Sequence, residues 1–440
     1  MTRYTSFVHR ILTQLKSDRI LGAAAVLAMT QLGASVAGLF RDRLLDATFP
    51  GLGVVDAYVA AFRPSDLLFQ VGVMSALGTV FVPLLASHKA HGRRHDMDKV
   101  LTGTMAMGAI LFGVLALALA LALPFIAHVF VNFEGEKLLL YMRFGQLALL
   151  TNFLFVFGNA FGQYLITEQR YWAYGITPIF YSLGTVAGTV WLTPQFGPYG
   201  PIIGTLCGAV VYVVWRFVAV IRLGWRLQSG WHPDLQSMGI LMLPRMLALG
   251  ALQLQLLLFD TIGSGLPQGS VTINYATRNF QGVLVGVVGI ALAQSVYSIL
   301  GQTAALREMH RFRAYIRKGT AMILFLTIPA SIALVILAPV AAELVKLTHV
   351  WEAFRWCLIL YALSVPFESL THLLLRAFYS LKNTMVPAVL GIASGVSAVA
   401  VAAFLAPRYG LFALPLGYLL GQVAETVILW VMLKKRLADR

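Results

Sequence analysis

The chain has 440 residues, of which 59% are hydrophobic and only 12% are charged. A soluble fold of this length could not bury that much apolar surface, so the composition excludes a soluble globular protein and indicates a membrane protein. The net charge of +15 would also suit a nucleic-acid-binding protein, but Lys and Arg cluster in short connections between apolar runs, as in cytoplasmic loops. No nucleic-acid partner is therefore predicted.

The apolar runs are long and continuous, which favours helices over a β-barrel, and about 20 apolar residues cross a bilayer. This criterion predicts spans in the first half near 19–43, 54–87, 100–131, 137–166, 171–194 and 199–223. In the second half it predicts spans near 237–262, 271–304, 318–345, 350–380, 384–406 and 410–434. The predicted fold is an all-α polytopic membrane protein with about twelve transmembrane helices in two six-helix bundles. Its predicted parts are a cytoplasmic N-terminal segment over 1–18, a first bundle over 19–226, a cytoplasmic linker over 227–236 and a second bundle over 237–440.

Cations concentrate in alternate connections between the predicted spans, and this bias predicts an orientation. They precede the first span and follow the second, sixth, eighth and twelfth, for example Arg10, Arg94, Arg226, Arg311 and Lys435. The other connections are poor in cations, so the positive-inside rule places both termini in the cytoplasm, which requires an even number of spans. No cleavable signal peptide is predicted, because the first apolar run leads directly into further helices.

The two halves of the sequence repeat each other at a constant offset of 215 positions. The matching pairs are Arg63 with Arg278, Pro124 with Pro339, and Tyr164 with Tyr379. Each half has an even number of predicted spans, so the two halves share one orientation in the membrane. Such a duplication is typical of a transporter with its site between two bundles near the midplane.

The second span carries charges at membrane depth, where one charge costs about 3 kcal/mol or more. Asp56 and Arg63 are seven residues apart, which is two turns along one helical face, so we expect them to line the same cavity wall. Pro64 removes a backbone donor, and a bend is predicted beside Arg63. Bends at this depth are tolerated where they face protein or a water-filled cavity.

Three other spans also place polar side chains at depth. Arg278 and Gln281 lie at the start of the eighth span, Arg245 lies in the seventh, and Arg41 ends the first. Together with Asp56 and Arg63, these are the predicted substrate-binding residues. The repeat favours a cavity role for Arg63 and Arg278 over a structural ion pair. For Arg41 the alternative is an interfacial cluster, since long side chains at helix ends reach the membrane surface.

Two acidic residues are candidates for ion coupling. Asp260 lies near the end of an apolar span, where it either binds a coupling ion or proton or reaches the outer interface. Glu368 shares a helical face with Arg376, so the alternative there is an internal ion pair.

The sequence lacks a nucleophile elbow, a phosphate-binding glycine loop and an ATPase signature, so neither an enzyme nor a cofactor is predicted. Cysteine and histidine spacing predicts no metal site. Arginine keeps its charge in a low-dielectric cavity and binds oxyanions bidentately, so an anionic cargo is predicted.

Short motifs appear in order along the chain. The first half has Gly38-Leu-Phe-Arg41-Asp42, Asp56-Ala-Tyr-Val-Ala-Ala-Phe-Arg63 and Ala76-Leu-Gly-Thr-Val-Phe-Val-Pro83. The second half has Leu243-Pro-Arg245, Gly269-Ser-Val-Thr-Ile-Asn-Tyr-Ala-Thr-Arg278, Gly289-Ile-Ala-Leu-Ala and Arg376-Ala-Phe-Tyr-Ser-Leu-Lys-Asn-Thr-Met-Val-Pro387. Through these motifs the chain resembles the lipid II flippases (MurJ/MviN) over essentially all twelve predicted spans.

The resemblance implies the multidrug/oligosaccharidyl-lipid/polysaccharide (MOP) exporter fold, alternating access, and outward flipping of an undecaprenyl-pyrophosphate-linked peptidoglycan precursor in the bacterial cytoplasmic membrane. It also implies that Arg41, Asp56 and Arg278 line the central cavity, with Arg63 in place of a basic residue there. The cations would hold the pyrophosphate. Ser35, Phe69 and Gln70 stand where the family often has basic residues, and many members have fourteen helices, two of which hold the lipid tail.

Other functions compatible with these residues belong to different classes. One is a flippase for another polyprenyl-linked oligosaccharide, and a second is a cation-coupled multidrug antiporter that uses Asp260 and Glu368. A third is a membrane scaffold that recruits cell-wall synthesis proteins through its basic loops. The expected partners of the favoured flippase are the bilayer, a lipid-linked anion and, as a further possibility, those cell-wall synthesis proteins.

Overall fold

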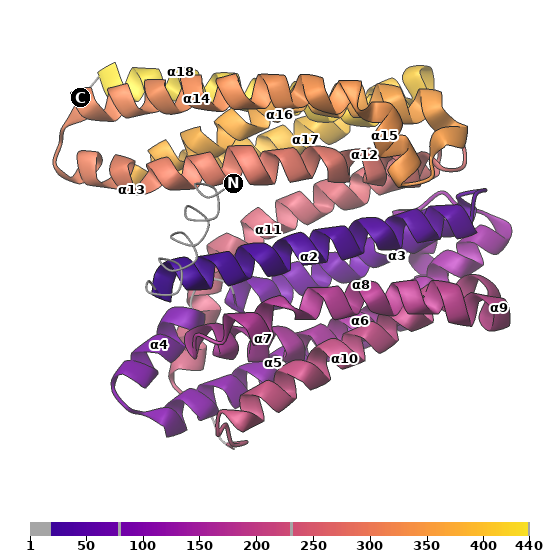
Figure 1. Ribbon diagram of the computed structural model, residues 1–440, viewed down its shortest axis with the longest axis horizontal. Coiled ribbons are helices and arrows are strands. Elements are labelled where there is room, and N and C mark those ends of the chain that lie inside the picture. Colours follow the sequence, from indigo (N-terminus) through magenta and orange to yellow (C-terminus); the bar gives the residue numbers. More distant parts are fainter. Residues whose placement is uncertain (1–18, 78–80, 229–231, 439–440) are drawn as a thin grey trace, which may run out of the picture. The chain divides into compact units, whose positions relative to one another are not determined.

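The computed structural model describes residues 19–77, 81–228 and 232–438, and these residues form helices without a β-strand (Figure 1). The predicted cytoplasmic segment 1–18 lies outside them. In the first half the helices are α2 (Arg19–Thr48), α3 (Gly53–Phe69), the π-helix η1 (Gln70–Met74), α4 (Val82–Ala90), α5 (Arg94–Phe130), α6 (Gly135–Thr167), α7 (Tyr171–Gly175), α8 (Thr177–Ala187), the π-helix η3 (Gly188–Leu192), α9 (Thr193–Phe196), η4 (Gly197–Tyr199) and α10 (Gly200–Arg222).

The second half continues in the same way. Its helices are α11 (Asp234–Ser264), α12 (Ser270–Leu284), the π-helix η5 (Val285–Ile290), α13 (Ala291–Ala305), α14 (Met309–Ile336), α15 (Ala338–Leu344), η6 (Thr348–Val350), α16 (Trp351–Ser380), α17 (Met385–Tyr409), η7 (Gly410–Phe412) and α18 (Ala413–Ala438). Within the described residues, which leave out 78–80 of the second span, each predicted span coincides with a helix or a run of consecutive helices.

Among the described residues, 7 helical stretches are long and apolar enough to cross a membrane. Two of them, Tyr171–Arg222 and Met385–Ala438, are 52 and 54 residues long, and each contains two of the predicted spans. The predicted polytopic α-helical architecture is confirmed.

The contacts divide the chain into two compact units. The first comprises Met1–Thr48, Pro64–Phe125 and Tyr141–Leu247, and the second comprises Phe49–Arg63, Ile126–Leu140 and Ala248–Arg440. The second unit therefore includes the start of α3, and the end of α5 with the start of α6, in addition to the later helices. These two short segments carry Asp56, Arg63 and Lys137.

In the first unit, α8 and η3 pack against α10 through glycines. A Cβ atom added to Gly184 would lie 2.5 Å from the Cα atom of Gly208, and one added to Gly188 would lie 2.6 Å from the Cα atom of Gly204. In a membrane the hydrophobic effect does not drive helices together, so close backbone approach at small residues supplies van der Waals contact instead. The glycines therefore set the distance between these two helices.

Replacing Gly184 with Ala should destabilise the first unit by roughly 2 kcal/mol, because the added methyl group meets backbone atoms that cannot rotate away. The measurement is the thermal unfolding midpoint of the purified protein in detergent. The matched control is Gly38→Ala in α2, where nothing lies within 4 Å of the added Cβ. Equal midpoints for the two variants would contradict this account of the packing.

The first unit also buries Arg216 of α10, which is 1% exposed and which sequence analysis did not single out. Its Nε, Nη1 and Nη2 atoms donate hydrogen bonds to Thr177 Oγ1 (2.9 Å), Gly158 O (2.8 Å) and Tyr174 O (3.1 Å). The guanidinium also lies 4.1 Å from the ring centroid of Tyr212. With all three nitrogens bonded, this arginine holds α10 against its neighbours.

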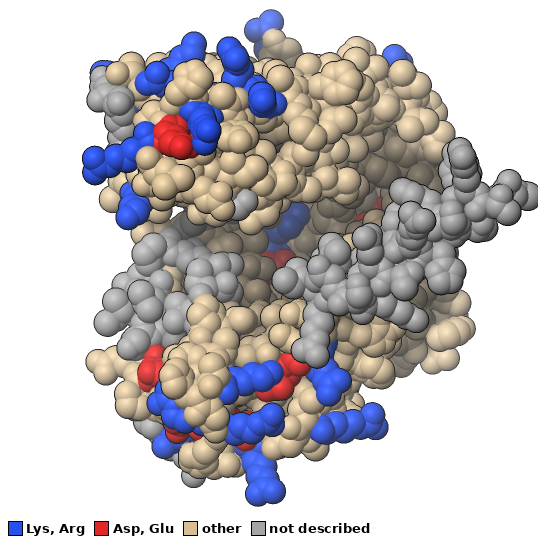
Figure 2. Space-filling view, turned by 60° about the vertical axis from the view of Figure 1, so that its left-hand side comes forward, with Lys and Arg blue, Asp and Glu red and all other residues tan. Residues whose placement is uncertain are grey.

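In the second unit, α12, α13 and α14 pack against α16, and α16 and α17 pack against α18. The connection between α13 and α14 and the end of α18 lie at the same end of this unit (Figure 1). Both are rich in Lys and Arg, and Figure 2 shows such side chains gathered on this unit, whereas most of the rest of the unit seen in that view is uncharged. This grouping agrees with the alternation of basic connections in the sequence.

The backbone repeats as the sequence does. The π-helix η1 begins at Gln70 and the π-helix η5 begins at Val285, 215 positions later. Gly92 and Arg307, also 215 positions apart, both have positive φ angles, of 70° and 57°. Local irregularities at matching places support an internal duplication. The helix α3 continues through Pro64, and the departure from α-helical geometry comes at η1.

Candidate functional site

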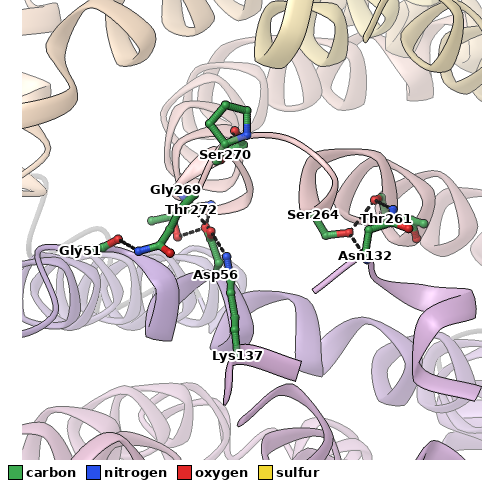
Figure 3. A network of polar contacts seen from close by, with 11 residues as sticks. Gly51, Asp56, Asn132, Lys137, Thr261, Ser264, Gly269, Ser270 and Thr272 are labelled. Carbon is green, nitrogen blue, oxygen red and sulfur yellow. Dashed lines mark hydrogen bonds and ion pairs between the residues drawn. The ribbon is translucent and has the colours of Figure 1, made fainter. Parts of the chain in front are cut away.

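A buried carboxylate organises the start of α12 in the second unit (Figure 3). Asp56 is 1% exposed, and its Oδ2 atom accepts hydrogen bonds from Gly269 N and from Lys137 Nζ, both at 2.7 Å. Its Oδ1 atom accepts from Thr272 N (2.9 Å) and Thr272 Oγ1 (2.7 Å). Figure 3 shows the lysine and the backbone donors converging on this one side chain.

Asp56 thus acts as an N-cap supplied by another helix. The first backbone N–H groups of a helix have no partner within it and carry a partial positive charge, so a carboxylate there satisfies the donors and interacts favourably with the helix dipole. Lys137 balances the remaining charge. The consequence for the site is that α12, which carries Arg278 and Gln281, begins at a fixed place relative to α3.

The second unit's part of α3 ends at Arg63, which is paired with an acid. Its Nε atom donates to Asp260 Oδ2 at 2.6 Å, and the two side chains are 15% and 4% exposed. The guanidinium also lies 5.9 Å from the ring centroid of Tyr275 in α12. Asp260 is 3% exposed, so its predicted reach to an outer interface is replaced by this buried ion pair.

Arg278 is held differently. Its guanidinium lies 4.9 Å from the ring centroid of Tyr418 in α18. Its Nη1 atom is buried and has no hydrogen-bond partner among the residues that the structure describes. A buried cationic donor without a partner is costly, so its presence points to a ligand that is an oxyanion.

Glu368, an acid of the same network, is already engaged. Glu368 Oε2 accepts hydrogen bonds from Tyr418 OH (2.8 Å) and from the side-chain amide of Gln281. The described hydrogen bonds of Glu368 thus join α12 and α18 to α16, and none of them comes from Arg376. In the same region Tyr361 OH donates to Asn274 Oδ1 at 2.7 Å. The aromatic and amide groups leave Arg278 beside a tyrosine ring rather than in an ion pair.

The structure places the predicted site residues as follows. The second unit contains Asp56, Arg63, Asp260, Arg278, Gln281 and Glu368. Arg41 belongs to the first unit, where its Nη2 atom lies 2.6 Å from Asp42 Oδ1. The side chain of Arg245 lies outside the described residues. Asp56 and Arg63, expected on one wall, have separate partners in Lys137 and Asp260.

Sequence analysis missed three members of this network. Lys137, Thr272 and Tyr418 were not among the predicted site residues. The signal for Tyr418 was present, because a tyrosine inside an apolar span needs a partner for its hydroxyl group. Lys137 had no such signal, since its partner Asp56 is 81 positions away.

Comparisons with known proteins agree with one another. The family model described as Lipid II flippase MurJ matches residues 48–439. The probable lipid II flippase MurJ of Bdellovibrio bacteriovorus is 26% identical over 96% of this chain and 84% of its own length, and the lipid II flippase MurJ of Burkholderia cenocepacia is 24% identical over 91% and 81%.

Solved structures are similar over nearly the whole chain. The structure titled lipid II flippase MurJ, inward closed conformation, matches with a TM-score of 0.79 at 19% identity, covering 93% of this chain and 87% of that one. An inward-facing multidrug resistance transporter of the MATE family, from the MOP superfamily, has a TM-score of 0.72 at 15% identity, with 94% of each chain covered. These likenesses confirm the predicted MOP-exporter-like fold.

Proposed function

Because the chain belongs to the MurJ family of lipid II flippases, we propose that Arg278 and Arg63 bind the pyrophosphate of lipid II while the protein carries it across the membrane. The chain is a multi-pass protein of the bacterial cytoplasmic membrane and acts in peptidoglycan biosynthesis. Flippases move their substrate without covalent chemistry, so the contribution of this site is binding and release.

The observation that carries the proposal is the buried, unpartnered Nη1 atom of Arg278, within the part of the chain that the structure describes. A guanidinium stays charged at any pH that the cell meets, and its fork matches two phosphate oxygens. The ring of Tyr418 supports the cation without neutralising it, because a ring face attracts a cation but carries no net charge. A pyrophosphate would supply the missing acceptor.

On substrate binding, Arg63 would exchange its ion pair with Asp260 for a contact with the pyrophosphate. A dianionic group competes well with one carboxylate for a guanidinium, and Asp260 would then be left with less positive charge beside it. This supports a second part of the proposal, that protonation or cation binding at Asp260 accompanies substrate binding. Glu368 as a coupling acid, and Arg41, Arg245 and Gln281 as substrate ligands, remain predictions.

Substrate would be captured from the cytoplasmic side and released on the other side by alternating access of the two bundles. The partners that this requires are the bilayer and a lipid-linked substrate. Contact with cell-wall synthesis proteins is a prediction of the sequence alone. Alternating access requires an inward-open and an outward-open conformation, and each of them must bind the head group. The relative free energies of the two conformations set which one the resting protein adopts.

The function is tested by depleting the resident lipid II flippase of a bacterium and expressing this chain in its place. We expect growth to be restored and lipid II to leave the inner leaflet. If the chain is inserted at normal abundance and lipid II still accumulates inside, the assignment of lipid II as its cargo is wrong.

A further inference from the structure

We propose that His88, His232 and Asp234 form a binding site for a divalent transition-metal ion of the zinc class, separate from the substrate site. One potential ligand atom from each residue lies within 4.8 Å of the other two. His88 belongs to the last turn of α4, His232 precedes α11 and Asp234 is its first residue. All three residues belong to the first unit.

The distances suit a small ion with nitrogen and oxygen ligands. His88 Nε2 and Asp234 Oδ2 form a hydrogen bond of 2.8 Å, which a bound ion would replace, and His232 Nδ1 lies 3.3 Å from the same oxygen. Zinc binds imidazole nitrogen and carboxylate oxygen at about 2.0–2.2 Å, which puts ligand atoms of a tetrahedron roughly 3.4 Å apart. Small movements of side chains would therefore bring the three donor atoms onto one ion.

The arrangement of lone pairs also favours a cation. The backbone N–H of Asp234 lies 3.3 Å from His232 Nδ1, a geometry that suits the tautomer in which this nitrogen has a lone pair. The same nitrogen nevertheless lies 3.3 Å from a carboxylate oxygen, which is a second electron-pair donor. Two lone pairs at this distance repel each other. A metal ion bound between the nitrogen and the oxygen would accept both lone pairs as ligands. The long hydrogen bond from the amide is weak and is easily exchanged for it.

The exposure and charge of these three side chains match a metal site that keeps one coordination position open for water. The side chains of His88, His232 and Asp234 are 4%, 15% and 32% exposed, so one side of the cluster faces solvent. Two neutral imidazoles and one carboxylate, with water as the fourth ligand, form a recognised zinc ligand set. Imidazole ligands also suit copper and nickel, so affinity alone would not select zinc.

Described residues near His232 and Asp234 in sequence contact the rest of the first unit. Before them, Arg226 N donates to Asp98 Oδ2 at 3.2 Å and Gln228 N donates to Thr102 Oγ1 at 3.4 Å, both on α5. After them, Leu235 is 1% exposed in the core of the first unit. A bound ion would tie the end of α4 to the start of α11, the helix that opens the second half of the sequence.

The test is a titration of the purified full-length chain, with any affinity tag removed, with Zn²⁺ by calorimetry and with Co²⁺ by visible absorption. We expect one ion per chain and the intense visible bands of tetrahedral Co²⁺. His232→Ala and Asp234→Asn should each weaken binding by at least about tenfold and abolish the bands, since each removes one of three protein ligands. His95→Ala, an exposed histidine at the start of α5, is the matched control and should leave both readouts unchanged.

Each outcome decides the proposal. Absence of stoichiometric binding by the unaltered chain would overturn it, as would unchanged binding by the double variant His232→Ala/Asp234→Asn. The thermal unfolding midpoint is recorded for every variant with and without Zn²⁺. A rise on adding the ion that occurs in the unaltered chain and in His95→Ala, but not in the ligand variants, supports the site even if a variant is less stable, because an ion that binds only the folded state raises its stability.

Discussion

Replacing Arg278 with Ala is expected to abolish lipid II transport while leaving the protein folded and inserted. The variant loses a guanidinium that is proposed to make two charge-assisted hydrogen bonds to the pyrophosphate, each contributing about 1.5–3 kcal/mol, so transport should fall by roughly 100-fold or more. Removing the Arg278 side chain breaks no ion pair among the described residues, because its described contact is with the ring of Tyr418. The measurement is growth and lipid II distribution in flippase-depleted cells, together with the amount of inserted protein.

Two further variants define what Arg278 contributes. Arg278→Lys keeps the charge but loses the planar fork, so its transport should lie between those of the unaltered chain and Arg278→Ala. Arg355→Ala removes an exposed arginine that lies 5.7 Å from the ring of Trp356 in the same unit, and it should have no effect. Normal transport by Arg278→Ala would remove this arginine from the site.

Replacing Asp56 with Ala is expected to impair folding of the second unit more than any change at the substrate ligands. The substitution leaves the Lys137 ammonium, two backbone N–H groups of the α12 start and the Thr272 hydroxyl without their shared acceptor. Breaking a buried pair in this way costs about 3–5 kcal/mol. The thermal unfolding midpoint in detergent and the abundance of inserted protein measure the loss.

The matched control for Asp56 is Asp96→Ala. Asp96 lies 3.9 Å from Arg93, whose side chain is 53% exposed, and such surface pairs contribute about 0–1 kcal/mol. Lys137→Ala should have an intermediate effect, since Asp56 keeps its hydrogen bonds to α12 but loses its counter-charge. If Asp56→Ala unfolds at the same temperature as the unaltered chain but fails in transport, Asp56 is a substrate ligand and its capping role is minor.

Two arginines of the apolar helices show why charge at membrane depth does not by itself identify a functional residue. Arg216 donates from all three guanidinium nitrogens to protein acceptors, and it therefore needs no ligand. Arg278 has a buried nitrogen without a described partner. The sequence distinguished the two only through the 215-residue repeat, which matches Arg278 with Arg63. Hydrogen-bond satisfaction is the physical criterion, and it requires coordinates.

The helices were predictable because twenty apolar residues in a row leave a membrane chain few alternatives. The pairing of polar residues was not. Asp56 and Arg63 share a helical face, yet Lys137 and Asp260 reach them from segments 81 and 197 positions away. The cluster of His88, His232 and Asp234 likewise joins residues 146 positions apart in sequence. Local spacing carries no information about such contacts, since they depend on how the helices pack.

Binding of lipid II to the purified chain tests the central claim most directly. Affinity is measured for lipid II and for an analogue that carries the same sugar-peptide and lipid but a single phosphate, with the unaltered chain and with Arg278→Ala. The account predicts that the unaltered chain prefers the pyrophosphate and that Arg278→Ala loses this preference. Equal affinity of the unaltered chain for the two lipids, or an unchanged preference in Arg278→Ala, would contradict it.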